Sequence, residues 1–161
     1  MTFKTADLCD QYSETRHLQI AEPIFRSFGG KSAFAGRVTT AKVFEDNVLL
    51  RTILGEKVED RVLVVDGGGS HRCALLGGSL SRLACENGWQ GIIVYGCIRD
   101  SVEISQLPIG MRALHTHPLK SHKRATGDRD NLITVAGVNF KTGYYVYADE
   151  DGIVVADDKL I

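Results

Sequence analysis

Arg99 and Asp100 are the neighbouring side chains whose types best combine to do chemistry in this chain. Arginine carries a planar guanidinium group that binds a carboxylate through two parallel hydrogen bonds and stays charged at any working pH. Aspartate supplies a hard oxygen ligand, and Mg²⁺ is often held by only one or two carboxylates together with water and substrate oxygens. The pair could therefore hold a metal–oxoacid complex, although a surface ion pair or a helix-start aspartate would use the same residues.

A second candidate is the stretch Gly77, Gly78, Ser79 and Leu80, where a helix is expected to begin. Free backbone N–H groups point outward at a helix N-terminus, and the positive end of the helix dipole attracts anions. Glycine has no side chain, so a ligand can approach the backbone closely. The stretch could bind a carboxylate, but a plain helix break with a serine cap would have the same sequence.

Continuous apolar runs predict the elements that would position these residues. Arg61–Val65 and Gly91–Tyr95 are typical of strands buried on both faces, and a helix is expected between them at about 79–87. This order predicts a βαβ unit with two parallel strands. Because ligands of α/β sheets bind at the carboxyl ends of strands, Arg99 and Asp100 lie where a site is expected.

The flanking segments contain short β-branched runs, so a mixed sheet is expected rather than a purely parallel one. Strands are expected near residues 37–44, 111–116, 133–140, 144–148 and 153–156, with a polar loop at 117–131. Thr5 and Asn47 are expected to cap two further helices, and residues 71–76 to form a short helix. The length fits one layered α/β domain over residues 1–161.

Composition limits the classes of function. The chain has a formal net charge of −1, with acids and bases mixed along it, which argues against direct binding of nucleic acid. No apolar run approaches the roughly 18 residues of a membrane span, and the first residues do not have the pattern of a signal peptide. We expect a cytoplasmic protein without membrane association, with reduced thiols at Cys9, Cys73, Cys85 and Cys97.

Three other patterns fit known sites less well. The run VLVVDGGGS is similar to a nucleotide- or methyl-donor-binding loop but lacks the full glycine spacing, although its Asp66 could border a cleft. His115, His117 and His122 have no acid or cysteine beside them to complete a zinc site. The two lysines of the 117–131 loop lie among polar residues, whereas a Schiff-base lysine needs an apolar pocket.

The spacing between the two candidate stretches carries a resemblance to a known family. Twenty residues separate Gly78 from Arg99, and Glu103 follows Asp100 after two more, which gives the pattern G-x20-R-D-x2-E. The pattern resembles the signature of the class II aldolases that cleave 4-hydroxy-4-methyl-2-oxoglutarate or 4-carboxy-4-hydroxy-2-oxoadipate. The wider sequence is similar to the RraA-like family (regulator of ribonuclease activity A) in the segments LCDQY, EPIFRSFGGKSAFAG, VLVVDGGGS, NGWQGIIVYGCIRD, HPLKSHKR and YVYADEDGIVV.

The resemblance implies a compact β/β/α sandwich of the swivelling-domain type that assembles as a ring-shaped homotrimer, with sites near subunit contacts. It implies that Arg99 and the backbone of the Gly77–Leu80 stretch bind pyruvate, and that Asp100 ligates a divalent cation, Mg²⁺ or Mn²⁺. Glu103 could orient the surroundings of that cation, with Asp66 as a further candidate, or Glu103 could be a solvated helix carboxylate.

Two functions follow from the resemblance. The first is a metal-dependent carbon–carbon lyase that releases pyruvate from 4-hydroxy-4-methyl-2-oxoglutarate and decarboxylates oxaloacetate through the same pyruvate enolate. The second is a non-catalytic inhibitor that binds ribonuclease E. Members best known as ribonuclease E inhibitors can lack the Arg–Asp pair, so the presence of Arg99 and Asp100 favours the enzyme.

Overall fold

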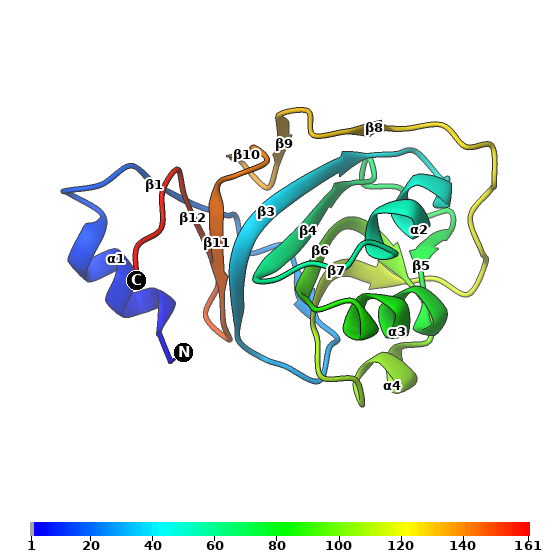
Figure 1. Cartoon of the computed structure of the whole chain (residues 1–161), viewed down its shortest axis with the longest axis horizontal. Coiled ribbons are helices and arrows are strands. Elements are labelled where there is room, and N and C mark those ends of the chain that lie inside the picture. Colours follow the sequence, from blue (N-terminus) through cyan, green and yellow to red (C-terminus); the bar gives the residue numbers. More distant parts are fainter. Residues whose placement is uncertain (1) are drawn as a thin grey trace.

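A computed structural model describes residues 2–161, and its centre is a set of parallel strands (Figure 1). These strands lie in the order β3 (Phe34–Lys42), β4 (Arg61–Asp66), β6 (Trp89–Ile98) and β7 (Gly110–Thr116). Helix α3 (Gly78–Glu86) lies between β4 and β6 in the chain, so the predicted βαβ unit is present.

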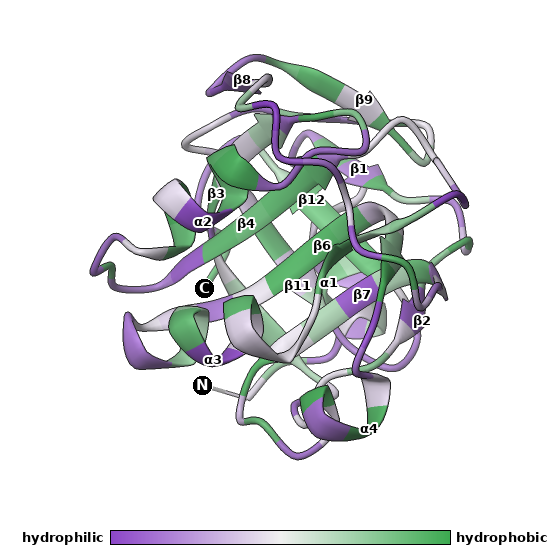
Figure 2. Cartoon of the chain, turned by 90° about the vertical axis from the view of Figure 1, so that its right-hand side faces the viewer, coloured by the Kyte–Doolittle hydropathy of each residue, from purple (hydrophilic) through white to green (hydrophobic). Residues whose placement is uncertain are grey.

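Both faces of the parallel strands are covered, which explains their continuous apolar runs. Along β4, Leu63 and Val65 belong to a core cluster beneath the helices, whereas Val62 and Val64 belong to a second cluster on the opposite face. The helices on the first face are α2 (Val48–Leu54), α3 and α4 (Ser101–Ile104), and Figure 2 looks onto them and the apolar strands behind. No helix within residues 2–161 is long and apolar enough to cross a membrane.

A second β-layer covers the other face of the sheet. It is made by the short antiparallel strands β1 (Leu18–Ile20), β9 (Ile133–Val135), β10 (Val138–Phe140), β11 (Tyr145–Ala148) and β12 (Ile153–Ala156). Strand β11 pairs with β3, so the sheet continues from parallel into antiparallel strands. Helix α1 (Thr5–Tyr12) packs outside this layer, where Leu8 joins a cluster with Tyr147. The mixed α/β fold that the sequence predicted is therefore confirmed.

The remaining strands are two residues or three residues long: β2 (Arg26–Ser27), β5 (Ala74–Leu76) and β8 (Asp128–Arg129). The prediction of a helix at residues 71–76 is wrong, because this segment contains β5. Strand β5 pairs in parallel with the end of β6, Ala74 opposite Cys97 and Leu76 opposite Ile98. Pairing with a neighbouring strand outweighs the helix propensity of an Ala-Leu-Leu run.

The predicted cap at Thr5 is wrong, and the predicted cap at Asn47 is right in position but not in its side-chain bond. Lys4 occupies the N-cap of α1, and the hydroxyl of Thr5 donates instead to Asp149, at 2.6 Å. Asn47 does occupy the N-cap of α2, but its side chain makes no capping bond. The carboxylate of Asp46 accepts the Val48 N–H at 3.0 Å and does the capping in its place.

Candidate active site

Arg99 and Asp100 directly follow Ile98, the last residue of β6, at the carboxyl edge of the parallel strands. Asp100 has a φ of 60°, a left-handed conformation that aspartate tolerates better than most residues. Its carboxylate reaches the first turn of α3, where Oδ2 accepts the N–H of Gly78 at 2.8 Å. The two stretches that the sequence pattern linked therefore meet in space.

The start of α3 offers free backbone donors beside this carboxylate. The first bonds of the helix run from the N–H and the hydroxyl of Ser81 to the oxygen of Gly77, at 3.1 and 2.7 Å. The N–H of Gly78 is taken by Asp100, which leaves those of Ser79 and Leu80 without an acceptor in the helix. Two adjacent N–H groups at a helix start can bind one carboxylate.

Gly77 and Gly78 are packed closely against the acidic residues of the neighbouring turn. A Cβ atom on Gly77 would lie 2.5 Å from Oδ2 of Asp100, and one on Gly78 would overlap the carboxylate of Glu103. Glu103 therefore belongs to this site, where it also forms an ion pair with Arg82 on α3. The absence of side chains at both glycines is what allows Asp100 to contact the helix start.

Arg99 is half-buried, and most of its guanidinium group is unused. Its backbone N–H donates to the oxygen of Leu76 at 3.0 Å, which fixes the residue next to β5. Within residues 2–161 its side chain makes a single hydrogen bond, from Nη1 to the oxygen of Pro118 at 3.4 Å. A guanidinium group has five N–H donors, so Arg99 keeps enough of them to bind a carboxylate in a fork.

The donor set fits a hard divalent cation. Within residues 2–161, Oδ1 of Asp100 accepts no hydrogen bond, and no group of three or more His, Cys, Asp and Glu side chains could hold a metal ion. A cation bound here would take one carboxylate from Asp100 and complete its shell with water and substrate oxygens. This pattern is typical of Mg²⁺, and Mn²⁺ accepts the same oxygen ligands.

Asp66 lies apart from this site. It is paired with Tyr95 on β6, four residues before Arg99, which is roughly 13 Å back along the strand at about 3.3 Å per residue. One of its oxygens accepts the Gly68 N–H at 2.9 Å, and with Lys42 it lines a separate cavity of about 420 Å³. The structure therefore joins Glu103 to the predicted site and leaves Asp66 outside it.

Within residues 2–161, the histidines of the last third of the chain belong to no group of three or more side chains that could hold a metal ion. The ring of His115 lies 5.1 Å from that of His71, and the backbone N–H groups of His117 and His122 donate to the backbone oxygens of Ile98 and Glu45. Lys120 and Lys123 are exposed, as predicted for lysines of a solvated loop.

Asp46 holds the loop that carries Pro118, and the sequence analysis did not identify it. It is buried, and its Oδ2 accepts the N–H groups of Arg124 at 2.7 Å and Thr126 at 3.3 Å. Burial opposes its ionisation, but the hydrogen bonds from Val48, Thr126 and Arg124 outweigh burial and keep its pKa below the usual value. The aspartate two residues before the first residue of α2 was the available signal, since this spacing is typical of capping.

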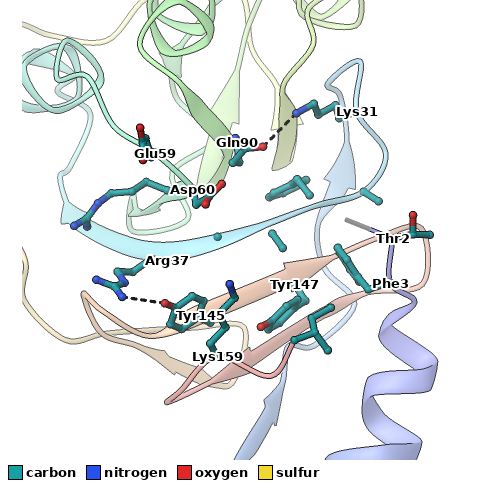
Figure 3. Close-up of a pocket in the computed structure, with 16 residues that line it drawn as sticks. Thr2, Phe3, Lys31, Arg37, Glu59, Asp60, Gln90, Tyr145, Tyr147 and Lys159 are labelled. Atoms are coloured by element: carbon teal, nitrogen blue, oxygen red, sulfur yellow. Dashed lines mark hydrogen bonds between the residues drawn. The ribbon is translucent and has the colours of Figure 1, made fainter.

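A cavity of about 700 Å³ lies away from Arg99 and Asp100. It is found at the amino ends of β3, β4 and β6, where Arg37, Arg61 and Gln90 are among its lining residues (Figure 3). Its residues come from distant parts of the chain, so no local pattern predicted it.

Comparison with known proteins identifies the family. The model of the RraA-like family (Aldolase/RraA) matches residues 5–155. This chain belongs to the RraA-like family. A relative from Methylococcus capsulatus is 68% identical over 161 residues, which are 100% of both chains, and is named "Putative 4-hydroxy-4-methyl-2-oxoglutarate aldolase".

Two solved structures share the whole fold. The RNA-processing inhibitor RraA from Thermus thermophilis has a TM-score of 0.95 and 45% identity, over 100% of this chain and 96% of that one. A Geobacillus kaustophilus protein described as an S-adenosylmethionine:2-dimethylmenaquinone methyltransferase has a TM-score of 0.95 and 52% identity, over 98% and 97% of the two chains. The family fold expected from the sequence motifs is thus confirmed.

The methyltransferase name draws attention to the glycine-rich turn after β4. Gly68 and Gly69 have φ angles of 69° and 70°, and a Cβ on them would lie 2.8 Å from the Phe44 ring and 3.2 Å from the Tyr95 ring. The chain's own aromatic rings therefore pack against this turn. The glycines serve a tight strand-to-loop turn, which is the structural alternative to a cofactor-binding loop.

Proposed function

We propose that this chain is a divalent-metal-dependent lyase that cleaves 4-hydroxy-4-methyl-2-oxoglutarate to pyruvate and also decarboxylates oxaloacetate. The observation that carries the proposal is a meeting of three groups at the end of β6: a guanidinium with one long hydrogen bond, a carboxylate with an oxygen that accepts no bond within residues 2–161, and two backbone N–H groups without an acceptor in the helix. The name of the Methylococcus relative supports the substrate. The Arg–Asp pair supports a catalytic rather than a purely binding protein.

The proposed site recognises the 2-oxo acid end of the substrate. Its carboxylate fits the N–H groups of Ser79 and Leu80, which are fixed by the helix and need no rearrangement to donate. Arg99 places a permanent positive charge beside the same end, where negative charge develops on oxygen during the reaction. The Arg99 charge therefore stabilises the transition state more than the neutral keto group, whereas the N–H groups bind the carboxylate equally in both states.

The reaction follows from the chemistry of a 2-oxo acid. Removal of the proton from the 4-hydroxyl lets the C3–C4 bond break, and its electron pair passes to C3 as the enolate of pyruvate. C4 becomes the keto carbon of a second pyruvate, and protonation of C3 completes the first. Oxaloacetate gives the same enolate when it loses CO₂, so one site serves both reactions. A divalent cation held by Asp100 would supply Lewis-acid polarisation of the keto oxygen.

The test is pyruvate release from each substrate, with Mg²⁺ and then with excess EDTA, corrected for decay caused by the metal alone. We expect turnover only when protein and metal are both present. Asp100→Asn should abolish the metal-dependent part, while Glu86→Gln, which removes an exposed carboxylate at the other end of α3, should not. A folded Asp100→Asn protein with native activity would remove the metal site from the proposal.

We also propose that the active form is a homotrimer. Val102 on α4 and Leu119 in the neighbouring loop are 80% and 59% exposed, close to Asp100 and Pro118 in the sequence. Apolar side chains at the rim of an open site are suited to contact with a second copy. Light scattering should give three times the chain mass, and a monomeric protein with full turnover would contradict the trimer.

Inhibition of ribonuclease E is the second candidate function, favoured by the description of the Thermus relative as an RNA-processing inhibitor. The two functions are separated by one comparison. A folded oligomer that inhibits ribonuclease E cleavage without any metal-dependent turnover would favour the regulator, and turnover without inhibition would favour the enzyme alone.

A further inference from the structure

The 700 Å³ cavity at the amino edge of the sheet is a second place where the chain could bind a small molecule (Figure 3). Its size lies within the range of ligand sites, which is about 300–1,000 Å³. It is lined by the amino ends of β3, β4 and β6, whereas Arg99 follows the carboxyl end of β6. Strand β6 has 10 residues, so the two places are roughly 30 Å apart at about 3.3 Å per residue.

Two cations in this cavity have unused donors. Arg37 donates from Nη2 to the hydroxyl of Tyr145 at 2.9 Å, which leaves its other N–H groups without a protein acceptor among residues 2–161. Lys159 lines the same cavity and forms no ion pair in the described chain, and Figure 3 shows its side chain pointing toward Tyr145. By contrast, Lys31 is bound to Gln90 at 3.3 Å.

An aromatic wall lies next to these cations. The rings of Phe3 and Tyr147 meet edge to face, with centroids 5.5 Å apart, and both residues line the cavity. The Tyr145 ring centroid lies 5.5 Å from the guanidinium carbon of Arg37, which is within the range of a cation–π contact. The cavity thus combines a fixed cationic side with a surface suited to a flat apolar group.

Two carboxylates, Glu59 and Asp60, also line the cavity. They would repel a second negative charge on a ligand, while the cations attract the first. We propose that this cavity binds a small organic monoanion, in which a carboxylate lies between Arg37 and Lys159. A flat apolar group attached to that carboxylate packs against the half-buried rings of Phe3 and Tyr145. This site is separate from the proposed lyase site and does not depend on its activity.

The test is calorimetric titration of the native oligomer, without metal, using benzoate as the probe. We expect saturable binding of benzoate and binding at least about tenfold weaker for benzamide, which has nearly the same shape but no charge. Terephthalate, which adds a second carboxylate across the ring, should also bind more weakly than benzoate. Equal binding of benzamide would overturn the charge recognition that the proposal requires.

Variants place the binding in the cavity. Arg37→Gln and Lys159→Gln should each weaken benzoate binding about tenfold, because a hydrogen bond to a charged group accounts for roughly that factor. Lys141→Gln, at an exposed lysine outside the cavity, is the matched control. Arg99→Ala should bind benzoate like the native protein, and a loss there would move the binding to the other edge of the sheet. The proposal would be overturned if the folded oligomer showed no saturable binding. A second copy covering the cavity would produce that result and overturn it equally.

Discussion

Asp100 at the carboxyl edge and Asp149 at the turn between β11 and β12 use their carboxylates in opposite ways. Asp149 is buried, and its two oxygens accept four hydrogen bonds: from the N–H and hydroxyl of Thr5, at 2.7 and 2.6 Å, and from the N–H groups of Asp151 and Gly152, at 3.0 and 3.3 Å. Asp100 is exposed and accepts one, from Gly78. A saturated carboxylate stabilises the fold, whereas an unsaturated one is available to a ligand.

The arginines of the two regions differ in the same way. Arg112 is buried beside the Asp149 turn. Its guanidinium donates to the backbone oxygens of Ser32 at 2.6 Å and Asp149 at 3.0 Å, and to the Ser27 hydroxyl at 2.9 Å. Arg99 makes one longer side-chain bond, of 3.4 Å. The comparison predicts that substitutions at the carboxyl edge reduce turnover and leave stability intact, and that substitutions around Asp149 do the reverse.

Arg99→Ala should have the largest effect. Removing the charge that faces the developing oxyanion is expected to lower kcat/KM for oxaloacetate about 10²–10³-fold, the usual effect of losing one such donor. The midpoint of urea unfolding should stay close to native, since among residues 2–161 the side chain donates only to the backbone oxygen of Pro118. Arg51→Ala, at an exposed arginine of α2, is the control for a general loss of charge. Turnover within a few-fold of native would remove Arg99 from the site.

Asp149→Asn should lower the free energy of unfolding by about 1–3 kcal/mol at pH 7, because it replaces an acceptor oxygen with a donor that faces an N–H group. Urea titration at fixed protein concentration measures the effect, and the exposed Asp10→Asn on α1 is the control. Turnover per folded molecule should be unchanged. If Asp149→Asn instead abolished turnover at native stability, the comparison of the two aspartates would fail.

The effect of Asp149→Asn should also depend on pH. Burial opposes ionisation of Asp149, but the hydrogen bonds from Thr5, Asp151 and Gly152 outweigh burial and hold its pKa below the usual value. A carboxyl group with a lowered folded-state pKa contributes its stability above the unfolded-state pKa of about 3.9 and loses it as pH falls through the folded value. The difference between native and variant proteins should therefore be largest near neutral pH and shrink in acid.

The parts of the fold that local pattern determines were predictable. Strands β4 and β6 are buried on both faces, so their apolar runs were visible in the sequence, and α3 was bounded by Gly77 and Gly88. The meeting of Gly78 with Asp100 was predicted through the spacing of a family signature. The placement of Asp100 beside the start of α3 was therefore the easiest part of the carboxyl edge to anticipate, and the chemistry assigned to it stays a prediction.

The parts that distant pairing determines were not predictable. Thr5 is bound to Asp149, 144 residues away, so nothing near Thr5 indicated that its hydroxyl would not cap α1. Residues 71–76 contain a strand because the end of β6 offers a free edge. Asp66 was a site candidate at the end of a buried strand. In the sheet it lies opposite Tyr95, four residues before Arg99.

Gly77→Ala tests the smallest feature of the comparison, the space that lets Asp100 reach α3. The added Cβ would lie 2.5 Å from Oδ2 of Asp100, closer than real Cβ contacts come, so this exposed carboxylate must move away from the helix start. A misplacement of about 1 Å can cost 10²-fold in rate, so this shift should lower kcat by about ten- to a hundredfold and change its dependence on Mg²⁺ concentration. Gly152→Ala is the matched control, since a Cβ there meets no atom within 4 Å. Native kinetics for Gly77→Ala would show that the contact between Asp100 and the helix start does not position the carboxylate for catalysis.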